Sequence, residues 1–305
     1  MYYQWSSCNL AGRMLPGCED REIAEQLTDR PLQPSDVFCF PLVCSWRARI
    51  WNLFDDFITD EVKTEFVQNP PEYIFSDDLS WLDEMIFEVT GRVSNIKELA
   101  AKRFGREFRA FRAAHATRTN DLALFYERGL RFLRPEEIEE KARAIFNVAQ
   151  SEPAAEKRFQ MAIDEIQARD KSGGRNGRLY FCANERSLID RSGGSGHYLI
   201  YGSEYLYCIG IRVAGTWNAK KTLKAIGRPT MFVCDIPIEM MRSSTVEEFV
   251  GIILGCLFRE LLSGQESDVL NSSVGSALSL AVDVPAECIV GHYHPAMIYD
   301  PFWSA

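Results

Sequence analysis

The sequence predicts an α+β fold, and three observations support it. Helical patterns dominate the first third of the chain, short apolar strand patterns begin after it, and the strands lack regular βαβ spacing. With 305 residues, of which 46% are hydrophobic and 25% charged, the chain is long enough to bury a sizeable core without disulfides.

Residues 1–104 are expected to form a helix-rich N-terminal domain. Residues 1–30 are polar and loosely helical in pattern, and the proline-rich, aromatic stretch that follows predicts turns and then a short helix. "NPPEY" marks a break. "SDDLSWLDEMIFEVTG" predicts a helix that begins near Ser76 or Asp77 and stops at Gly91, and "SNIKELAAKRFG" predicts a second one. No chemistry is evident in this region.

Residues 105–305 are expected to form a second domain with a mixed β core. "EFRAFRAAHAT", "RLYFCA", "PTMFVCDIPIEMM" and "VPAECIVGHYHPAMI" have strand character. A helix is predicted in "TNDLALFYERGL", capped near Thr119 or Asn120 and closed by Gly129. Further helices are predicted in one or two segments after "RPEEIEE" and in "TVEEFVGIILGCLFRELLSG". No Gly-x-Gly-x-x-Gly or phosphate-loop motif is present, which disfavours Rossmann and nucleoside-triphosphatase folds.

Composition narrows the partners and the compartment. No apolar run approaches the roughly 20 residues that span a bilayer, and the start lacks the pattern of a secretory signal. The nine scattered cysteines indicate reduced thiols in a cytoplasm. A net charge of −9 argues against bulk nucleic-acid or membrane binding. Cys39 with Cys44, and His292 with His294, each offer half a metal site, so we expect no metal.

The stretch "HATRTNDLALFYERGLR" contains one of only four histidines. On its own residues, a satisfied core histidine is the simplest interpretation. The stretch nevertheless resembles the first motif of the poly(ADP-ribose) polymerase-like ADP-ribosyltransferases of the His-Tyr-Glu type. That motif is a strand histidine, a small residue, a Ser or Thr, a helix and Gly-Leu-Arg. The matching residues are His115, Ala116, Thr117, Arg118, Gly129, Leu130 and Arg131.

Three later stretches follow in the family's order. "GRLYFCANERS" resembles the tyrosine strand, with Tyr180 and Phe181 in place and the glycine one residue early. "MFVCDIPIEMM" resembles the next strand, and "AECIVGH" resembles the last, with Glu287 at its start. Taken singly, Tyr180 is a half-buried residue of an edge strand and Glu287 is a solvated acid.

The sequence departs from the family at two places. Ala116 stands where the family has glycine. The family's serine-bearing helix does not follow Tyr180 directly, because "RSGGSG" intervenes; Ser203, with Tyr201 or Tyr207, takes over its roles in this interpretation. Tyr201 is also an alternative to Tyr180 as the motif tyrosine.

The resemblance implies cleavage of the bond between nicotinamide and ribose in NAD, through an oxocarbenium-like transition state. His115, supported by Thr117, would hydrogen-bond a ribose hydroxyl. Tyr180 and the second tyrosine would face the nicotinamide ring, and Ser203 its carboxamide. Glu287 would accept from the 2′-hydroxyl, stabilise the developing cation and act as base on the acceptor.

A basic strip surrounds His115. It comprises Lys102, Arg103, Arg106, Arg109, Arg112, Arg118, Arg128, Arg131 and Arg134, opposed by Glu107, Asp121 and Glu127. Either it serves the NAD pyrophosphate or a phosphate-bearing acceptor, or it is a solvated face. Arg131, in the matched Gly-Leu-Arg, is the candidate for the adenosine side.

The sequence therefore predicts a mono-ADP-ribosyltransferase that uses NAD as substrate and modifies a protein or nucleic acid. Compact enzymes of this type resemble bacterial or phage-related effectors and toxins. An NAD glycohydrolase and a non-catalytic binding module of the same fold remain alternatives. Residues 1–104 would position the acceptor, contact an inhibitory partner protein or gate the NAD cleft.

Overall fold

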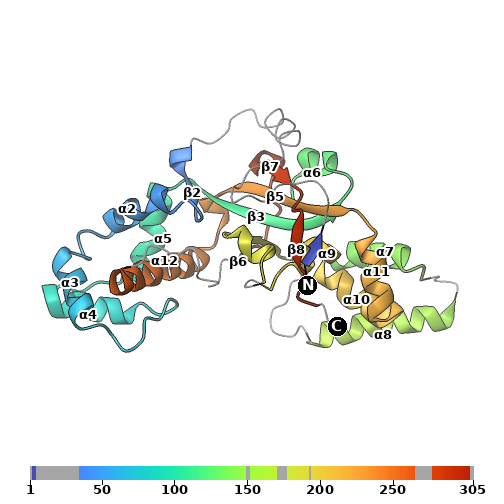
Figure 1. The fold of residues 1–305 in the computed structure, drawn as a ribbon, viewed down its shortest axis with the longest axis horizontal. Helices are drawn as coiled ribbons and strands as arrows, with labels where there is room; N and C mark the ends of the chain where they lie inside the picture. Colours follow the sequence, from blue (N-terminus) through green and yellow to red (C-terminus); the bar gives the residue numbers. More distant parts are fainter. Residues whose placement is uncertain are drawn as a thin grey trace. The chain divides into compact units, whose positions relative to one another are not determined.

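A computed structural model describes residues 2–4, 34–148, 152–169, 177–191, 194–264 and 277–302. The fold is mixed α+β, as the sequence predicts (Figure 1). Contacts divide the chain into two compact units: a first unit of Met1–Pro31, Ala114–Cys234 and Ser279–Ala305, and a second unit of Leu32–Ala113 and Asp235–Leu278. The divisions fall inside strands β3 (Ala110–Thr119), β5 (Arg228–Pro237) and β6 (Ala277–Leu280).

The second unit is mostly helical. Its elements are η1 (Pro34–Asp36), β2 (Val37–Cys39), α2 (Val43–Leu53), α3 (Asp60–Gln68), α4 (Ser80–Thr90), α5 (Ile96–Glu107), η3 (Ile238–Met240) and α12 (Ser243–Ser263). Strand β2 pairs in parallel with the start of β3. Phe38 is fully buried and its ring lies 5.2–5.6 Å from those of Trp46, Phe104 and Phe249, so this core is aromatic.

Local signals set the helix ends in this unit. Gly91 closes α4 with φ 70°, which confirms the predicted stop. The predicted start at Ser76 or Asp77 is wrong, since α4 begins at Ser80, whose amide donates to the Asp78 carboxylate at 2.9 Å. Asn95 caps α5, as its side chain accepts from the Glu98 amide at 3.1 Å.

The expected domain border between residues 104 and 105 falls inside α5. Each compact unit instead combines segments from distant parts of the chain. Helix α12 joins the N-terminal helices because it packs along α5 (Figure 1). Its buried face includes Val246, Phe249 and Leu257. This pairing of distant segments has no local signature in the sequence. No helix among the described residues is long and apolar enough to cross a membrane.

The first unit contains the other elements. They are β1 (Tyr2–Gln4), α6 (Ala123–Arg128), α7 (Pro135–Ile145), α8 (Pro153–Arg169), β4 (Leu179–Cys182), η2 (Glu185–Leu188), α9 (His197–Tyr201), α10 (Glu204–Ala214), α11 (Thr216–Lys224), η4 (Ala286–Cys288), β7 (Ile289–Tyr293) and β8 (Met297–Tyr299). Of residues 1–30, expected to be loosely helical, only β1 is described, and it pairs antiparallel with β8.

The main sheet has the strand order β6-β4-β3-β5-β7, with β2 also beside β3. Successive side chains of a strand point to opposite faces, so the residues of the first unit's strands can be assigned to one or the other side of the sheet. On what we term the helical side, Ala114, Ala116, Met231 and Val233 join one core cluster with residues of α7–α11. On the opposite side, which we term the His115 side, His115 and Thr117 are half-buried.

Helix α6 lies on the His115 side. The Phe125 ring of α6 is 4.6 Å from that of Phe232, which lies between Met231 and Val233 of β5 and therefore points away from the helical side. Helix α6 also contacts η4, the turn that carries Glu287. The sheet thus places the first and last matched motifs on one side.

Candidate functional site

His115 lies on β3 and is held by the neighbouring strand. Its Nδ1 is 2.8 Å from the carbonyl oxygen of Tyr180. Because a carbonyl only accepts, Nδ1 carries the proton and Nε2 is left as an acceptor. Burial lowers the pKa of His115, an effect that this hydrogen bond partly opposes. His115 is therefore neutral at pH 7 and can accept a hydrogen bond from a hydroxyl.

The aromatic ring beside His115 belongs to Phe181 rather than Tyr180. Ala114 lies opposite Cys182 in the antiparallel pair of β3 and β4, and both belong to the core cluster of the helical side. Alternation then places Tyr180 on that side and Phe181 on the His115 side. The ring centroids of His115 and Phe181 are 5.6 Å apart. Tyr180 thus reaches His115 through its main chain alone.

The sequence assigned no role to Phe181, although Phe181 matches the family together with Tyr180. No signal in the sequence gives this placement, because it depends on the register of the two strands: Ala114 opposes Cys182, so the next pair in the antiparallel ladder is His115 with Phe181.

Glu287 is exposed and lies in η4, just before β7. The chain leading to it is fixed by the matched Gly-Leu-Arg. Leu130 and Val284 exchange two main-chain hydrogen bonds of 2.8 Å each. At Gly129, with φ 78°, a Cβ atom would lie 2.0 Å from the carbonyl oxygen of Val284, so this approach requires glycine.

The same segment also holds the start of β4. The Leu133 amide donates to the Arg178 carbonyl at 3.3 Å, and the Gly177 amide donates to the Leu133 carbonyl at 3.1 Å. Residues 130–134 therefore connect the strand of Tyr180 and Phe181 with the chain that carries Glu287.

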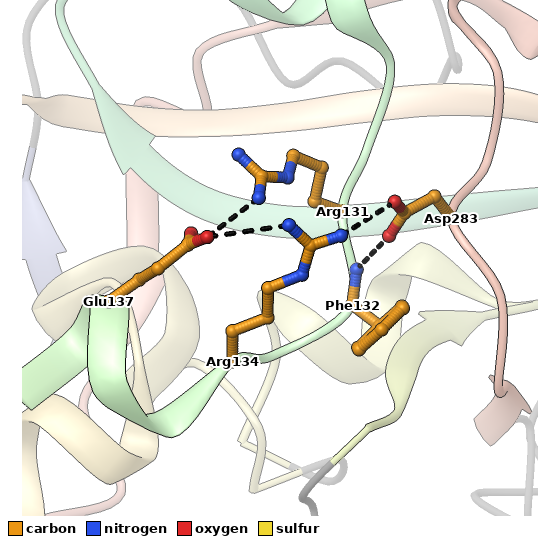
Figure 2. A network of polar contacts seen from close by, with 5 residues as sticks. All are labelled: Arg131, Phe132, Arg134, Glu137 and Asp283. Atoms are coloured by element: carbon orange, nitrogen blue, oxygen red, sulfur yellow. Dashed lines mark hydrogen bonds and ion pairs between the residues drawn. The ribbon is translucent and has the colours of Figure 1, made fainter.

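A network of charges surrounds this segment (Figure 2). Arg131 and Arg134 point toward one oxygen of Glu137, at 2.6 and 3.4 Å. Arg134 also pairs with Asp283 at 3.2 Å, and Asp283 accepts the Phe132 amide at 2.9 Å. Arg131, expected on the adenosine side of NAD, is exposed and engaged with Glu137.

Most of the other expected cofactor ligands lie on the helical side of the sheet, opposite to the side of His115. Tyr201 is 1% exposed, donates to Asp300 at 2.7 Å and stacks on Tyr207 at 4.7 Å between ring centroids. Both tyrosines belong to the core cluster on the helical side. Ser203 caps α10 by accepting from the Leu206 amide. Ala116 is buried in the same cluster, while Thr117 shares the side of His115.

Two arginines of the basic strip form hydrogen bonds within the fold. Arg118 is 7% exposed and donates to several carbonyls, those of Leu199, Lys224, Ile226 and Gly227. Arg112 forms two hydrogen bonds, of 2.6 and 2.7 Å, with the buried carboxylate of Asp235. The strip is therefore not a uniform solvated face.

Glu287 stands apart from the histidine. Strand β5 lies between β3 and β7, and within the described ranges no hydrogen bond or ion pair joins Glu287 to His115. The residues that the structure describes include no group of three or more His, Cys, Asp or Glu placed to hold a metal ion. No known family model matches the chain, and neither curated proteins nor solved structures give a match.

Proposed function

We propose that this protein cleaves NAD and transfers ADP-ribose to a macromolecular acceptor. One observation carries the proposal: the stretches that resemble the family's three motifs are linked by hydrogen bonds within one unit. His115 bonds the Tyr180 carbonyl, Leu133 bonds the start of β4, and Leu130 bonds Val284 ahead of Glu287. Chance matches scattered along a chain have no reason to meet in this way.

In this proposal, the His115 side of the sheet holds the nicotinamide riboside part of NAD. The Nε2 of His115 accepts from a ribose hydroxyl, and the Phe181 ring offers an apolar surface beside the nicotinamide. Glu287 accepts from the 2′-hydroxyl and stabilises the cationic carbon as nicotinamide departs. Arg131 serves the adenosine side. Tyr180 orients His115 through its carbonyl, and Tyr201, Ser203 and Tyr207 are left out of the site because they lie on the helical side.

The test uses the full chain, NAD labelled in its adenylate half and a cell lysate, with nicotinamide release as the first readout. Label that stays with the macromolecules after washing and is then released by protease indicates a protein acceptor. Release by nuclease indicates a nucleic-acid acceptor. Free ADP-ribose alone indicates a glycohydrolase. A folded protein that releases no nicotinamide, with or without lysate, overturns the proposal.

A further inference from the structure

We propose that Asp283 is a positioning residue for Glu287; this inference rests on the proposed function. Asp283 lies four positions before Glu287 in the chain. Its carboxylate is engaged on both oxygens by the segment that follows Gly129 (Figure 2).

The two contacts of Asp283 differ in kind. Oδ1 accepts the main-chain amide of Phe132 at 2.9 Å, and Oδ2 accepts from Arg134 at 3.2 Å. The next residue, Val284, exchanges both main-chain hydrogen bonds with Leu130. Two consecutive residues are thus fixed to residues 130–134, and their side-chain and main-chain bonds set both the position and the direction of the chain.

The link from this anchor to Glu287 is short and stiff. Pro285 has φ −58°, which its ring enforces, and the Cys288 amide closes the η4 turn by donating to the Pro285 carbonyl at 3.1 Å. The proline ring and the closed turn both restrict the chain between Val284 and Glu287. A displacement of Asp283 therefore moves the Glu287 carboxylate, and displacements near 1 Å cost on the order of 100-fold in rate.

The hydrogen bond from the Phe132 amide to Asp283 is the contact that positions the chain. The side chains of Asp283 and Arg134 are 40% and 37% exposed, and ion pairs this accessible to water contribute little. The bond to the Phe132 amide needs an acceptor oxygen but no charge. Asparagine retains such an oxygen, and alanine does not.

The experiment compares Asp283→Ala and Asp283→Asn with wild type, with Glu136→Gln as the control. Glu136 is an exposed acid in the first turn of α7. For Asp283→Ala we expect kcat for nicotinamide release to fall at least about tenfold while KM for NAD stays within about threefold. For Asp283→Asn we expect kcat within about threefold of wild type, and for Glu136→Gln no change.

A second readout does not depend on activity. Hydrogen exchange of a peptide covering residues 284–290 should be faster in Asp283→Ala and return to the wild-type rate in Asp283→Asn. An unchanged kcat in Asp283→Ala, or equal losses in both variants, overturns the proposal. If wild type releases no nicotinamide, the proposed function fails on its own, and unchanged exchange in Asp283→Ala then overturns the positioning role separately.

Discussion

Leu130 and Val284 exchange both of their main-chain hydrogen bonds, at 2.8 Å each. The pair attaches the end of the first matched motif to the chain that enters the last one. It forms directly beside Gly129, whose positive φ and lack of a side chain let the two segments approach. The close approach of the two segments therefore requires the glycine of Gly-Leu-Arg, whether or not the chain resembles the family.

Gly129→Ala should separate these segments. The new Cβ would lie 2.0 Å from the Val284 carbonyl, so we expect a loss of about 1–3 kcal/mol or more in the free energy of unfolding, measured in urea, and a loss of nicotinamide release. Gly215→Ala is the matched control, because Gly215 has φ 79° but nothing within 4 Å of its Cβ position. Equal effects of the two substitutions would show that the close approach is not what requires glycine.

Glu287→Gln should remove catalysis and leave the fold intact. The side chain is exposed, so we expect a change in unfolding free energy within about 0.5 kcal/mol. Loss of a carboxylate that stabilises a transition-state charge should lower kcat for nicotinamide release by roughly 10²–10³. Glu127→Gln is the control, because Glu127 is also an exposed acid but lies on α6. Full activity in Glu287→Gln would remove Glu287 from the site.

The parts of the fold that local patterns determine could be predicted from the sequence. The strand around His115 is present as β3, "RLYFCA" contains β4, and Gly129 closes α6. Periodicity and glycine stops are signals within a few residues, so one sequence suffices to find them. Helix α6 begins only at Ala123, where the Asp121 carboxylate accepts the Leu124 amide, and not at Thr119 or Asn120.

Properties that depend on distant partners could not be predicted. Nothing near α12 in the sequence shows that it packs on α5. Tyr201 and Tyr207 are suitable residues for a nicotinamide site by type, yet both are buried in the core cluster, where Asp300, from the far end of the chain, accepts from the Tyr201 hydroxyl. The sequence interpretation gave Tyr180 the ring beside the site, whereas the structure has Phe181 beside His115. The two differ by one residue along the strand, and a shift of one residue moves each side chain to the other face of the sheet.

His115 should make both activity and stability fall at acid pH. Burial lowers its pKa in the folded protein below the ordinary 6.5, so protonation favours the unfolded chain. The stabilising effect of neutral His115 is present above pH 6.5 and is lost as pH falls through the lowered pKa. Nicotinamide release should fall over the same window, because a protonated Nε2 no longer accepts.

His115→Asn is the variant for this test, since its amide still donates to the Tyr180 carbonyl but does not titrate. The unfolding free energy of His115→Asn should not show the fall at acid pH that protonation of His115 causes in the wild type. An acid limb of the wild-type activity profile with its midpoint above pH 6.5 would contradict the assignment.

Tyr180 and Phe181 should respond differently to conservative substitution. Tyr180→Phe removes only a hydroxyl on the helical side, so nicotinamide release should stay within about threefold of wild type. Phe181→Leu keeps an apolar side chain of similar size but removes the ring beside His115. We expect KM for NAD to rise about 2–10-fold, the equivalent of ~0.5–1.5 kcal/mol. A loss above tenfold in Tyr180→Phe with an unchanged Phe181→Leu would restore the tyrosine to the site.

Glu185, the first residue of η2, should destabilise the protein as pH rises. Its Oε2 is shielded from solvent and has no hydrogen-bond partner among the described residues. Burial raises the pKa of Glu185 to about 7, against a smaller opposing effect of Arg186. The protonated form is therefore favoured in the folded state. Its stabilising contribution is fully present below the ordinary pKa of 4.5 and is lost as pH rises through about 7.

Glu185→Gln removes this titration. Relative to wild type, we expect the variant to gain on the order of 1–3 kcal/mol in unfolding free energy between pH 5 and pH 8, measured in urea at both values. The exposed Glu140 on α7 provides the control, since Glu140→Gln should show no comparable pH-dependent gain. Parallel stability curves for wild type and Glu185→Gln across this range would mean that the Glu185 carboxylate reaches water in the folded protein.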